Sequence, residues 1–221
     1  MVAGGSGSRF GAPKQFSDLA GRPVAAWSVA AARTVADGVV LVVPAAGPGG
    51  GAGRKETDGG PDAPAMGADR VVSGGATRAE SVRAGLAAVP DDAVIIVVHD
   101  AARPLATGEL FTSVVAAVRA AGVDGVVPVL PVADTLKRVD GDTVQHSVDR
   151  EGLVAVQTPQ AFDAAVLRKA HRTGRDATDD AGLVEDLGAT VRTVVGDPHN
   201  VKLTRSEDLV LAEALINVVD R

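Results

Sequence analysis

Short runs of apolar residues alternate along the chain with longer segments in which apolar residues recur at helical spacing. The runs at Val39–Val43, Ala93–Val98 and Gly125–Leu130 are rich in Val, Ile and Leu, as is typical of strands buried on both faces of a parallel sheet. Shorter strands are expected at 70–72, 153–157 and 190–195. Helices are expected from Pro23 onward, over 80–89, 107–121, 161–172 and 180–187, and after a capping-box sequence at 204–207. This alternation predicts an α/β fold.

The alternation is interrupted between residues 135 and 148. Thr135–Val139 and Thr143–Val148 flank an Asp-Gly-Asp turn and predict a β-hairpin. Because an isolated two-stranded hairpin is marginally stable in water, we expect it to pack against a second subunit. The chain thus predicts a single domain over 1–221, with a Rossmann-like, mostly parallel twisted sheet, helices on both faces, and a projecting β-hairpin arm at 134–152 that forms a homodimer.

Two segments depart from this regular pattern. Only Met1–Ala3 precede the first glycines, which is short for a strand, so either the first strand is truncated or the natural start lies upstream. The segment 44–68 is rich in Gly and Pro. It cannot bury enough apolar surface to offset its ordering entropy, and we expect a surface loop there.

The composition excludes several classes of protein. Hydrophobic residues make up 46% of the 221 residues but aromatic residues only 2%, so the core must consist of Val, Leu, Ile and Ala. A net charge of −6 argues against a general nucleic-acid-binding surface, and any basic site must be local. The absence of cysteine excludes a disulfide framework. We find no long apolar run and no leader pattern, and therefore expect a cytoplasmic protein that does not bind membranes.

The first candidate for chemistry is the stretch Ala3–Gln15, which combines glycines and hydroxyl residues with the cations Arg9 and Lys14. Glycines let backbone N–H groups approach an anion together, and the two cations supply the charge that a polyphosphate requires. The stretch therefore predicts a phosphate-binding loop. Its spacing matches neither a Walker A loop nor a G-x-G-x-x-G motif, and a glycine-rich surface loop without a ligand is the alternative.

A second candidate lies at the carboxyl end of the strand over 93–98, where ligands bind in open α/β sheets. Asp100 can bind Mg²⁺ through its oxygens, and Arg103 can hold a phosphate in bidentate fashion. An ion pair between these two residues is the alternative. Ser81 lies in the first turn of the helix over 80–89 and faces a second glycine turn. Its alternative role is to satisfy backbone donors at the helix end.

Other cations and hydroxyl residues follow predicted strand ends and can converge on Asp100. They are Arg9, Lys14, Arg103, Thr135, Arg150, Thr158, Thr178 and Lys202. Many cations around one carboxylate suit transfer between phosphates better than proton abstraction or acyl transfer. The sequence shows no Ser-His-Asp or Cys-His arrangement. His146, His171 and His199 lack metal-ligand spacing and are expected on the surface.

Eight short motifs follow one another over nearly the whole chain. They lie at 3–9 with 13–15, 74–81, 99–104, 134–137, 148–150, 158–160, 178–180 and 201–204. Together they resemble the 2-C-methyl-D-erythritol 4-phosphate cytidylyltransferase family. The resemblance implies an Mg²⁺-dependent enzyme of isoprenoid precursor synthesis. It would transfer a cytidylyl group from CTP to 2-C-methyl-D-erythritol 4-phosphate, giving 4-diphosphocytidyl-2-C-methyl-D-erythritol and pyrophosphate.

The resemblance also implies a role for each matched residue. The catalytic cations, which would neutralise the triphosphate and the charge at the α-phosphate, are Arg9, Lys14 and Lys202. The residues that would bind CTP are Ala3, Gly4, Gly75 and Ser81, with Asp100 near the ribose and the metal. The residues that would hold the sugar phosphate are Arg103, Thr135, Thr158 and Thr178, joined by Arg150 from the partner subunit.

The chain departs from the family pattern in its short first strand, in the segment 44–68, which lacks a helix usual in the family, and at Ala76, where relatives often have a polar residue. Two rival functions stay open. One is ribitol-5-phosphate cytidylyltransferase, which shares the phosphate loop and the Thr-Pro-Gln motif. The other is a nucleotide-binding protein without turnover.

Overall fold

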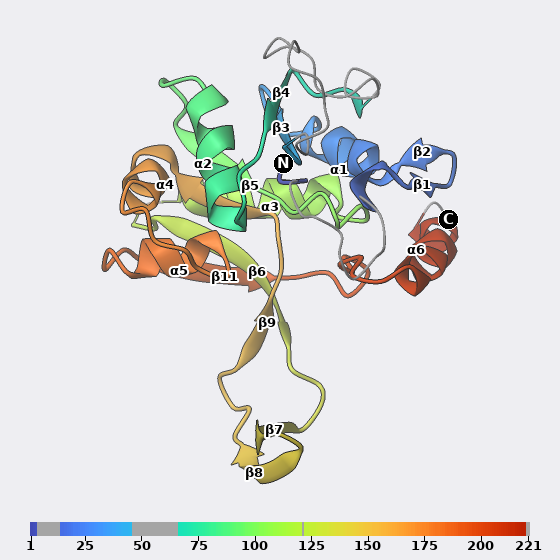
Figure 1. Cartoon of the computed structure of the whole chain (residues 1–221). Helices are drawn as coiled ribbons and strands as arrows, with labels where there is room; N and C mark the ends of the chain where they lie inside the picture. The colour runs from blue at the N-terminus through green and yellow to red at the C-terminus, as the bar shows by residue number, and fades with distance from the viewer. Residues whose placement is uncertain (4–13, 46–65, 121, 220–221) are drawn as a thin grey trace.

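The protein has an α/β body from which one arm projects (Figure 1). The structure, a computed structural model, describes residues 1–3, 14–45, 66–120 and 122–219. Most of the segment 44–68 lies outside these ranges. The α/β class predicted from the sequence is confirmed, and the alternation of strands and helices follows the expected order.

The central sheet is mixed. Its strand order is β11-β6-β10-β5, with bounds β5 (Ile95–Val98), β6 (Gly125–Pro131), β10 (Gln160–Asp163) and β11 (Val191–Val195). β11 runs parallel to β6, whereas β10 runs antiparallel to both β5 and β6. β9 (Val154–Val156) pairs antiparallel with the end of β6. The sheet is therefore less uniformly parallel than the sequence pattern predicts, because one inner strand is reversed.

The prediction of a helix over 161–172 is wrong at its start. Residues 160–163 form the inner strand β10, and α4 (Ala164–His171) begins only after it. Ala161 and Phe162 are fully buried because β5 and β6 flank them on either side. The Asp163 carboxylate accepts hydrogen bonds from the backbone N–H groups of Ala165 and Val166, so it caps the helix and sets its first residue.

Met1–Ala3 lie between β3 (Val40–Val43) and β5 and connect the two parts of the sheet. β3 pairs in parallel with β4 (Arg70–Ser73). Val2 forms parallel bridges to Val42 on one side and Asp100 on the other. Its N–H donates to the His99 carbonyl at 2.8 Å, and Ala3 N donates to the Val42 carbonyl at 2.8 Å. This short segment is thus anchored on both edges.

A cavity of about 750 Å³ lies beside Met1 and Val2, between β3 and β5.

Helices cover both faces of the sheet (Figure 1). One face carries α1 (Val24–Ala32) and α3 (Gly108–Arg119), and the other carries α2 (Arg78–Ala88), α4 and α5 (Asp180–Glu185). Aliphatic residues fill the core, as the low aromatic content predicts. Among the described residues, no helix is long and apolar enough to cross a membrane.

Smaller elements and the last helix lie beside α1. η1 (Lys14–Phe16), β1 (Asp18–Leu19) and β2 (Arg22–Pro23) precede α1. The last helix, α6 (Glu207–Val219), packs Ala212 and Ile216 near Leu19. The predicted capping box at 204–207 is wrong in one position. Asp208, and not Glu207, accepts the hydrogen bonds from Thr204 and Arg205.

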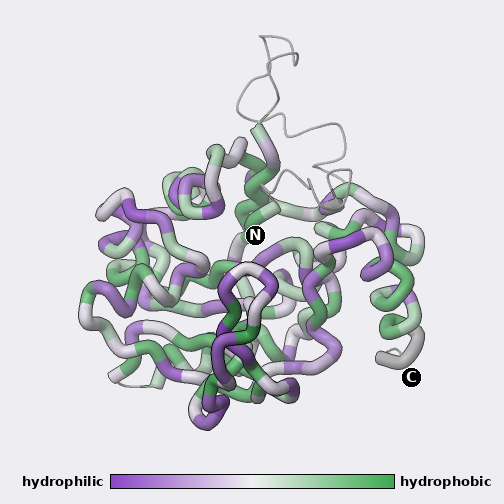
Figure 2. Tube along the Cα trace, turned by 60° about the horizontal axis from the view of Figure 1, so that its bottom comes forward, coloured by the Kyte–Doolittle hydropathy of each residue, from purple (hydrophilic) through white to green (hydrophobic). Residues whose placement is uncertain are grey.

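The predicted hairpin is confirmed. It consists of β7 (Leu136–Asp140) and β8 (Thr143–Val148), joined by a turn in which Gly141 has a φ of 57°. The hairpin forms the tip of the arm, which extends away from the body (Figure 1). Val139 and Val144 on the arm are each 55% exposed. Figure 2, in which the arm comes forward, shows apolar and polar stretches mixed along it.

Candidate active site

Asp100 lies between two cations just beyond the carboxyl end of β5. Its Oδ2 is 2.6 Å from the Lys202 ammonium, and its Oδ1 is 3.3 Å from Arg78 Nε. Burial alone would raise the pKa of Asp100, but the charges of Arg78 and Lys202 outweigh it and hold the pKa far below its usual range. The Asp100 carboxylate is therefore ionised, and it ties together two cations from different parts of the chain.

The three residues meet because the sheet brings together segments that are distant in sequence. Arg78 is the first residue of α2, whose N-cap is Thr77. Lys202 lies in the segment that follows β11, and this segment is fixed to the Asp100 loop by a hydrogen bond from Leu203 N to the Ala102 carbonyl at 2.8 Å. Within the described residues, Asp100 forms ion pairs with Arg78 and Lys202 and none with Arg103. The alternative of an Asp100–Arg103 ion pair is therefore wrong.

A buried histidine fixes the backbone of Asp100 through Thr158. His99 Nε2 lies 3.1 Å from the Arg103 carbonyl, which can only accept, so this nitrogen donates. Burial lowers the pKa of His99 to about 3, which keeps the ring neutral. Its Nδ1 then accepts the Thr158 hydroxyl proton at 3.1 Å, and the Thr158 oxygen accepts from Asp100 N at 3.0 Å.

This arrangement bears on the role expected for Thr158. Thr158 is only 5% exposed, and its one hydroxyl proton is directed at His99. Thr158 thus stabilises the Asp100 loop from behind. Its predicted contact with the sugar phosphate stays a prediction. His99, which the sequence analysis noted only as part of a motif, is part of the same unit.

Arg103 is held on the other side of this loop. Its Nη1 donates to the Asn200 carbonyl at 2.7 Å, and Asn200 in turn donates to the Thr158 carbonyl at 2.8 Å. Burial lowers the pKa of Arg103 from its ordinary value, against the opposing effect of Asp100. Arg103 Nε is buried and has no hydrogen-bond partner in the described part of the chain. The predicted contact of Arg103 with the sugar phosphate stays a prediction.

Gly75 and Ser81 form a compact turn at the start of α2. Gly75 N donates to the Ser81 hydroxyl oxygen at 3.2 Å, and the hydroxyl donates to the Thr77 carbonyl at 3.0 Å. A Cβ on Gly75 would lie 2.3 Å from Glu80 Cβ, so only glycine fits there. Ser81 therefore satisfies backbone groups as its alternative role predicts, and its contact with CTP stays a prediction.

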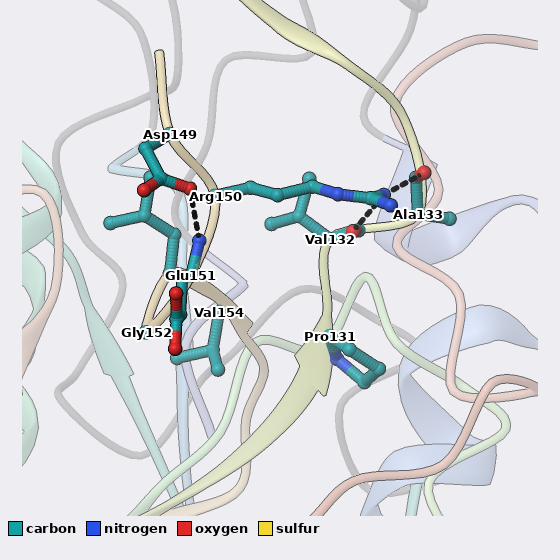
Figure 3. Close-up of a pocket in the computed structure, with 9 residues that line it drawn as sticks. Pro131, Val132, Ala133, Asp149, Arg150, Glu151, Gly152 and Val154 are labelled. Carbon is teal, nitrogen blue, oxygen red and sulfur yellow. Dashed lines mark hydrogen bonds between the residues drawn. The ribbon is translucent and has the colours of Figure 1, made fainter.

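The arm residues are not brought to Asp100 in this chain. Arg150 Nη1 donates to the Val132 carbonyl at 2.9 Å and also to the Ala133 carbonyl, at the base of the arm (Figure 3). These residues line a cavity of about 820 Å³ at the base of the arm. Thr135 lies exposed just before β7, and Thr178 lies exposed shortly before α5.

Several predicted residues fall at or beyond the limits of the description. Gly4 and Arg9 lie outside the described residues. Lys14 begins η1, but its side chain is not described. Ala3 is described and is 6% exposed, with its N–H bonded to β3. The phosphate-binding loop thus starts from a fixed point, and its own geometry stays a prediction.

Three further residues of this region were not predicted from the sequence. Arg78 and Asp180 fall within the motifs at 74–81 and 178–180 but were given no role, and His171 was expected on the surface but is 3% exposed. Arg78 had a weak signal, because a cation in the first turn of a helix is unfavourable beside the helix dipole and a nearby carboxylate offsets this. The burial of His171 had no signal in the sequence, since it depends on the packing of α4 against α5.

The comparison with protein families matches residues 1–218 to the model described as 2-C-methyl-D-erythritol 4-phosphate cytidylyltransferase. A protein of that name from Rubrobacter xylanophilus is 41% identical over 232 residues, covering 100% of this chain and 95% of its own length. The bifunctional enzyme IspD/IspF of Solidesulfovibrio magneticus is 44% identical, covering 97% of this chain and 56% of its own length.

Solved structures give the same result. The crystal structure of 2-C-methyl-D-erythritol 4-phosphate cytidylyltransferase from Thermus thermophilus is similar with a TM-score of 0.78 and 36% sequence identity. The match covers 98% of this chain and 96% of the other. The structural likeness therefore spans the body and the arm alike.

Proposed function

Because the chain belongs to the 2-C-methyl-D-erythritol 4-phosphate cytidylyltransferase family, we propose that it transfers a cytidylyl group from CTP to 2-C-methyl-D-erythritol 4-phosphate in isoprenoid precursor synthesis. The observation that supports this most directly is the Lys202–Asp100–Arg78 group at the carboxyl end of β5. It presents fixed positive charge at the sheet edge where nucleotides bind in such folds.

The reaction is a displacement at phosphorus. An oxygen of the substrate phosphate forms a bond to the α-phosphorus of CTP, and the bond from that phosphorus to the α,β-bridging oxygen breaks. Pyrophosphate leaves with the bonding electron pair. Negative charge grows around the α-phosphorus in the transition state. The Lys202 ammonium, held at 2.6 Å by Asp100, is a preorganised cation that stabilises this charge without a covalent intermediate.

The remaining predicted residues divide the substrates between them. The backbone and small side chains of Ala3, Gly4, Gly75 and Ser81 bind the base of CTP, while Arg9 and Lys14 neutralise its triphosphate. The sugar phosphate is held by a set of donors from several elements. They are Arg103, Thr135 and Thr178, with Arg150 from the partner subunit. Thr158, whose hydroxyl proton goes to His99, supports this set through the Asp100 loop.

Magnesium is proposed as the cofactor, but the geometry does not favour Asp100 as its ligand. Each oxygen of the Asp100 carboxylate already faces a cation, and these cations would repel a metal ion bound directly. Within the described ranges, no cluster of three or more potential metal-ligating side chains exists. Mg²⁺ commonly binds through substrate phosphates, and we place it on the triphosphate of CTP.

This placement is tested with Asp100→Asn. Loss of the carboxylate releases Lys202, so kcat falls, but the Mg²⁺ concentration that gives half-maximal activity stays within about twofold of the wild-type value. Loss of a residue that binds the metal, or of one that hydrogen-bonds to such a ligand, changes metal affinity by roughly 10–100-fold or more. A rise of that size in a Mg²⁺ titration of pyrophosphate release would make Asp100 a metal ligand after all.

We also propose a homodimer in the cytoplasm. Val139 and Val144 on the arm are exposed, as are Leu153, Val154 and Val156 at its base, and a monomer would leave this apolar set in water. A two-stranded hairpin such as β7–β8 gains stability by packing on another surface. The cytoplasmic location rests on the absence of cysteine from the sequence and on the soluble substrates.

The decisive experiment measures pyrophosphate release from CTP and Mg²⁺ with 2-C-methyl-D-erythritol 4-phosphate and ribitol 5-phosphate in parallel. We expect turnover with the first substrate. Turnover with ribitol 5-phosphate alone would reassign the enzyme to that substrate. CTP binding in the absence of turnover with either substrate would make it a nucleotide-binding protein.

A further inference from the structure

The ion pairs around Asp100 continue inward beyond Arg78. Arg78 Nη2 lies 2.8 Å from Asp180 Oδ2, and Asp180 Oδ1 lies 2.9 Å from His171 Nε2. The Lys202 side chain is 43% exposed, while the side chains of Asp180 and His171 are 1% and 2% exposed. A row of alternating charge therefore extends from the accessible ammonium of Lys202 to a buried histidine.

Each member of this row comes from a different segment of the chain. Asp180 is the first residue of α5 and His171 the last of α4, whereas Arg78 begins α2. Asp179, next to Asp180, caps α5 by accepting from Gly182 N at 3.0 Å. Its other oxygen accepts from Gln160 Nε2 at 3.0 Å. These two bonds hold the start of α5 so that Asp180 lies buried beside Arg78.

Asp180 supplies the second negative charge that Arg78 requires. Burial would lower the pKa of Arg78, but the charges of Asp180 and Asp100 outweigh this effect and raise it. Without Asp180, Asp100 would be the only carboxylate in the row for both Arg78 and Lys202. Asp180 therefore leaves the Asp100 carboxylate able to hold the Lys202 ammonium at short range.

His171 fixes Asp180 in turn. Burial would raise the pKa of Asp180, but the hydrogen bond from His171 and the charge of Arg78 lower it, so the carboxylate is ionised. His171 Nε2 must then be the donor. His171 Nδ1 has no hydrogen-bond partner in the part of the chain that the structure describes. Asp180 is thus the one hydrogen-bond partner of this buried ring among the described residues.

We propose that His171 and Asp180 are positioning residues for cytidylyl transfer. They act through Arg78 on Asp100 and so set the place of the Lys202 ammonium. The inference rests on the proposed function, since its consequence is a change in turnover. The competing explanation is that the His171–Asp180 pair only fastens α4 to α5, in which case it affects stability and not catalysis.

The test compares His171→Leu, His171→Gln and Asp180→Asn with the wild-type enzyme in kcat, in KM for CTP and in thermal unfolding. Displacing a catalytic group by a fraction of an ångström to 1 Å lowers rates by up to about 10²-fold. We expect His171→Leu and Asp180→Asn to lower kcat by about 10–10²-fold with a smaller change in KM. The amide of glutamine can still donate to Asp180, so His171→Gln should recover most of kcat.

Arg168→Leu is the matched control. Arg168 lies on the same helix as His171 and donates to the carbonyls of Leu86, Val89 and Pro90 at the end of α2, away from the Asp180 pair. Its loss loosens the packing of α4 on α2. We expect Arg168→Leu to lower the unfolding temperature and to leave kcat per folded molecule unchanged, which separates instability from mispositioning.

A double variant identifies the route of the effect. If His171 acts only through Asp180, then His171→Leu in the Asp180→Asn background causes no further fall in kcat. Multiplying effects, or an unchanged kcat in folded His171→Leu enzyme, would overturn the inference. A wild-type protein without turnover in the same assay would refute the proposed function as well, whereas an active wild type with unaffected variants refutes this inference alone.

Discussion

At the residue scale, Asp100 is held from two directions by different kinds of interaction. Arg78 and Lys202 hold its carboxylate through charge, while the neutral pair of His99 and Thr158 holds its backbone N–H. The His99 ring also packs against Phe111, with the ring centroids 5.0 Å apart. Because Nδ1 of His99 accepts the Thr158 hydroxyl proton, protonating the ring requires that hydroxyl to turn its proton away.

The first prediction concerns the effect of acid on stability. The unfolded chain binds a proton at His99 below about pH 6.5, whereas burial lowers the folded pKa to about 3. The stability due to neutral His99 is therefore complete above the unfolded pKa and is lost as the pH falls toward the folded pKa. The loss approaches about 1.4 kcal/mol per pH unit. Urea unfolding at about pH 7 and about pH 5 measures it.

The comparison that isolates this residue uses His99→Gln, which cannot titrate. We expect this variant to be less stable than the wild type at neutral pH but to lose less stability on acidification. His146→Gln, on the exposed hairpin, is the control and should keep the wild-type pH dependence. Equal slopes for the wild type and His99→Gln would mean that His99 is not held neutral.

At the element scale, the reversed strand β10 determines how the sheet is filled. It lies between β5 and β6 and places Phe162, which is fully buried, next to Gly125 at the start of β6. A Cβ on Gly125 would lie 2.6 Å and 2.8 Å from two atoms of the Phe162 ring. The large side chain on one strand therefore requires the smallest residue on its neighbour.

The second prediction follows from this contact. Gly125→Ala should lower the free energy of unfolding by about 1–3 kcal/mol, the usual range for overpacking a core. Gly38→Ala is the matched control, since it is exposed and its nearest contact would be 3.8 Å away. It should change stability by no more than about 0.5 kcal/mol. Equal urea midpoints for the two variants would show that β10 can move to accommodate the methyl group.

At the scale of the whole molecule, the arm separates residues that the family resemblance assigns to one site. Asp100 and Lys202 lie in the body, whereas Arg150 lies on the arm and bonds to the carbonyls of Val132 and Ala133 at its base. An arm that projects from the body reaches a second copy more readily than its own sheet edge (Figure 1). The proposed dimer thus completes a site that one chain leaves without Arg150.

The third prediction tests this sharing. Arg150→Ala and Lys202→Ala chains should each be inactive alone, while a mixture should recover activity through hybrid dimers. One site of each hybrid contains both changes and the other contains neither, so an equal mixture approaches about a quarter of the wild-type activity. Subunit exchange is verified with differently tagged chains. No recovery after complete exchange would assign Arg150 to the site of its own subunit.

The α/β class, the order of most elements and the hairpin were determined by the sequence, because they depend on local spacing. The secondary structure of a four-residue stretch was harder to predict from the sequence. Gln160–Asp163 is too short for its periodicity to distinguish strand from helix, and only its pairing with β5 and β6 decided the matter. Asp208 replaced Glu207 as the cap for a similar reason, since both residues offer a carboxylate near the same N–H groups.

The row from Lys202 to His171 was decided by the tertiary structure alone. Lys202 and Asp100 are 102 positions apart, and Arg78 and Asp100 are 22 apart. Hydrophobic periodicity predicts which face of each element is buried, but it does not predict which ends of different elements lie together. A charge gains a partner only where two such ends come within a few ångströms in a region of low dielectric. The sequence therefore supplied the cations and carboxylates of the site, and the packing of α2, α4 and α5 on the sheet determined which of them form ion pairs.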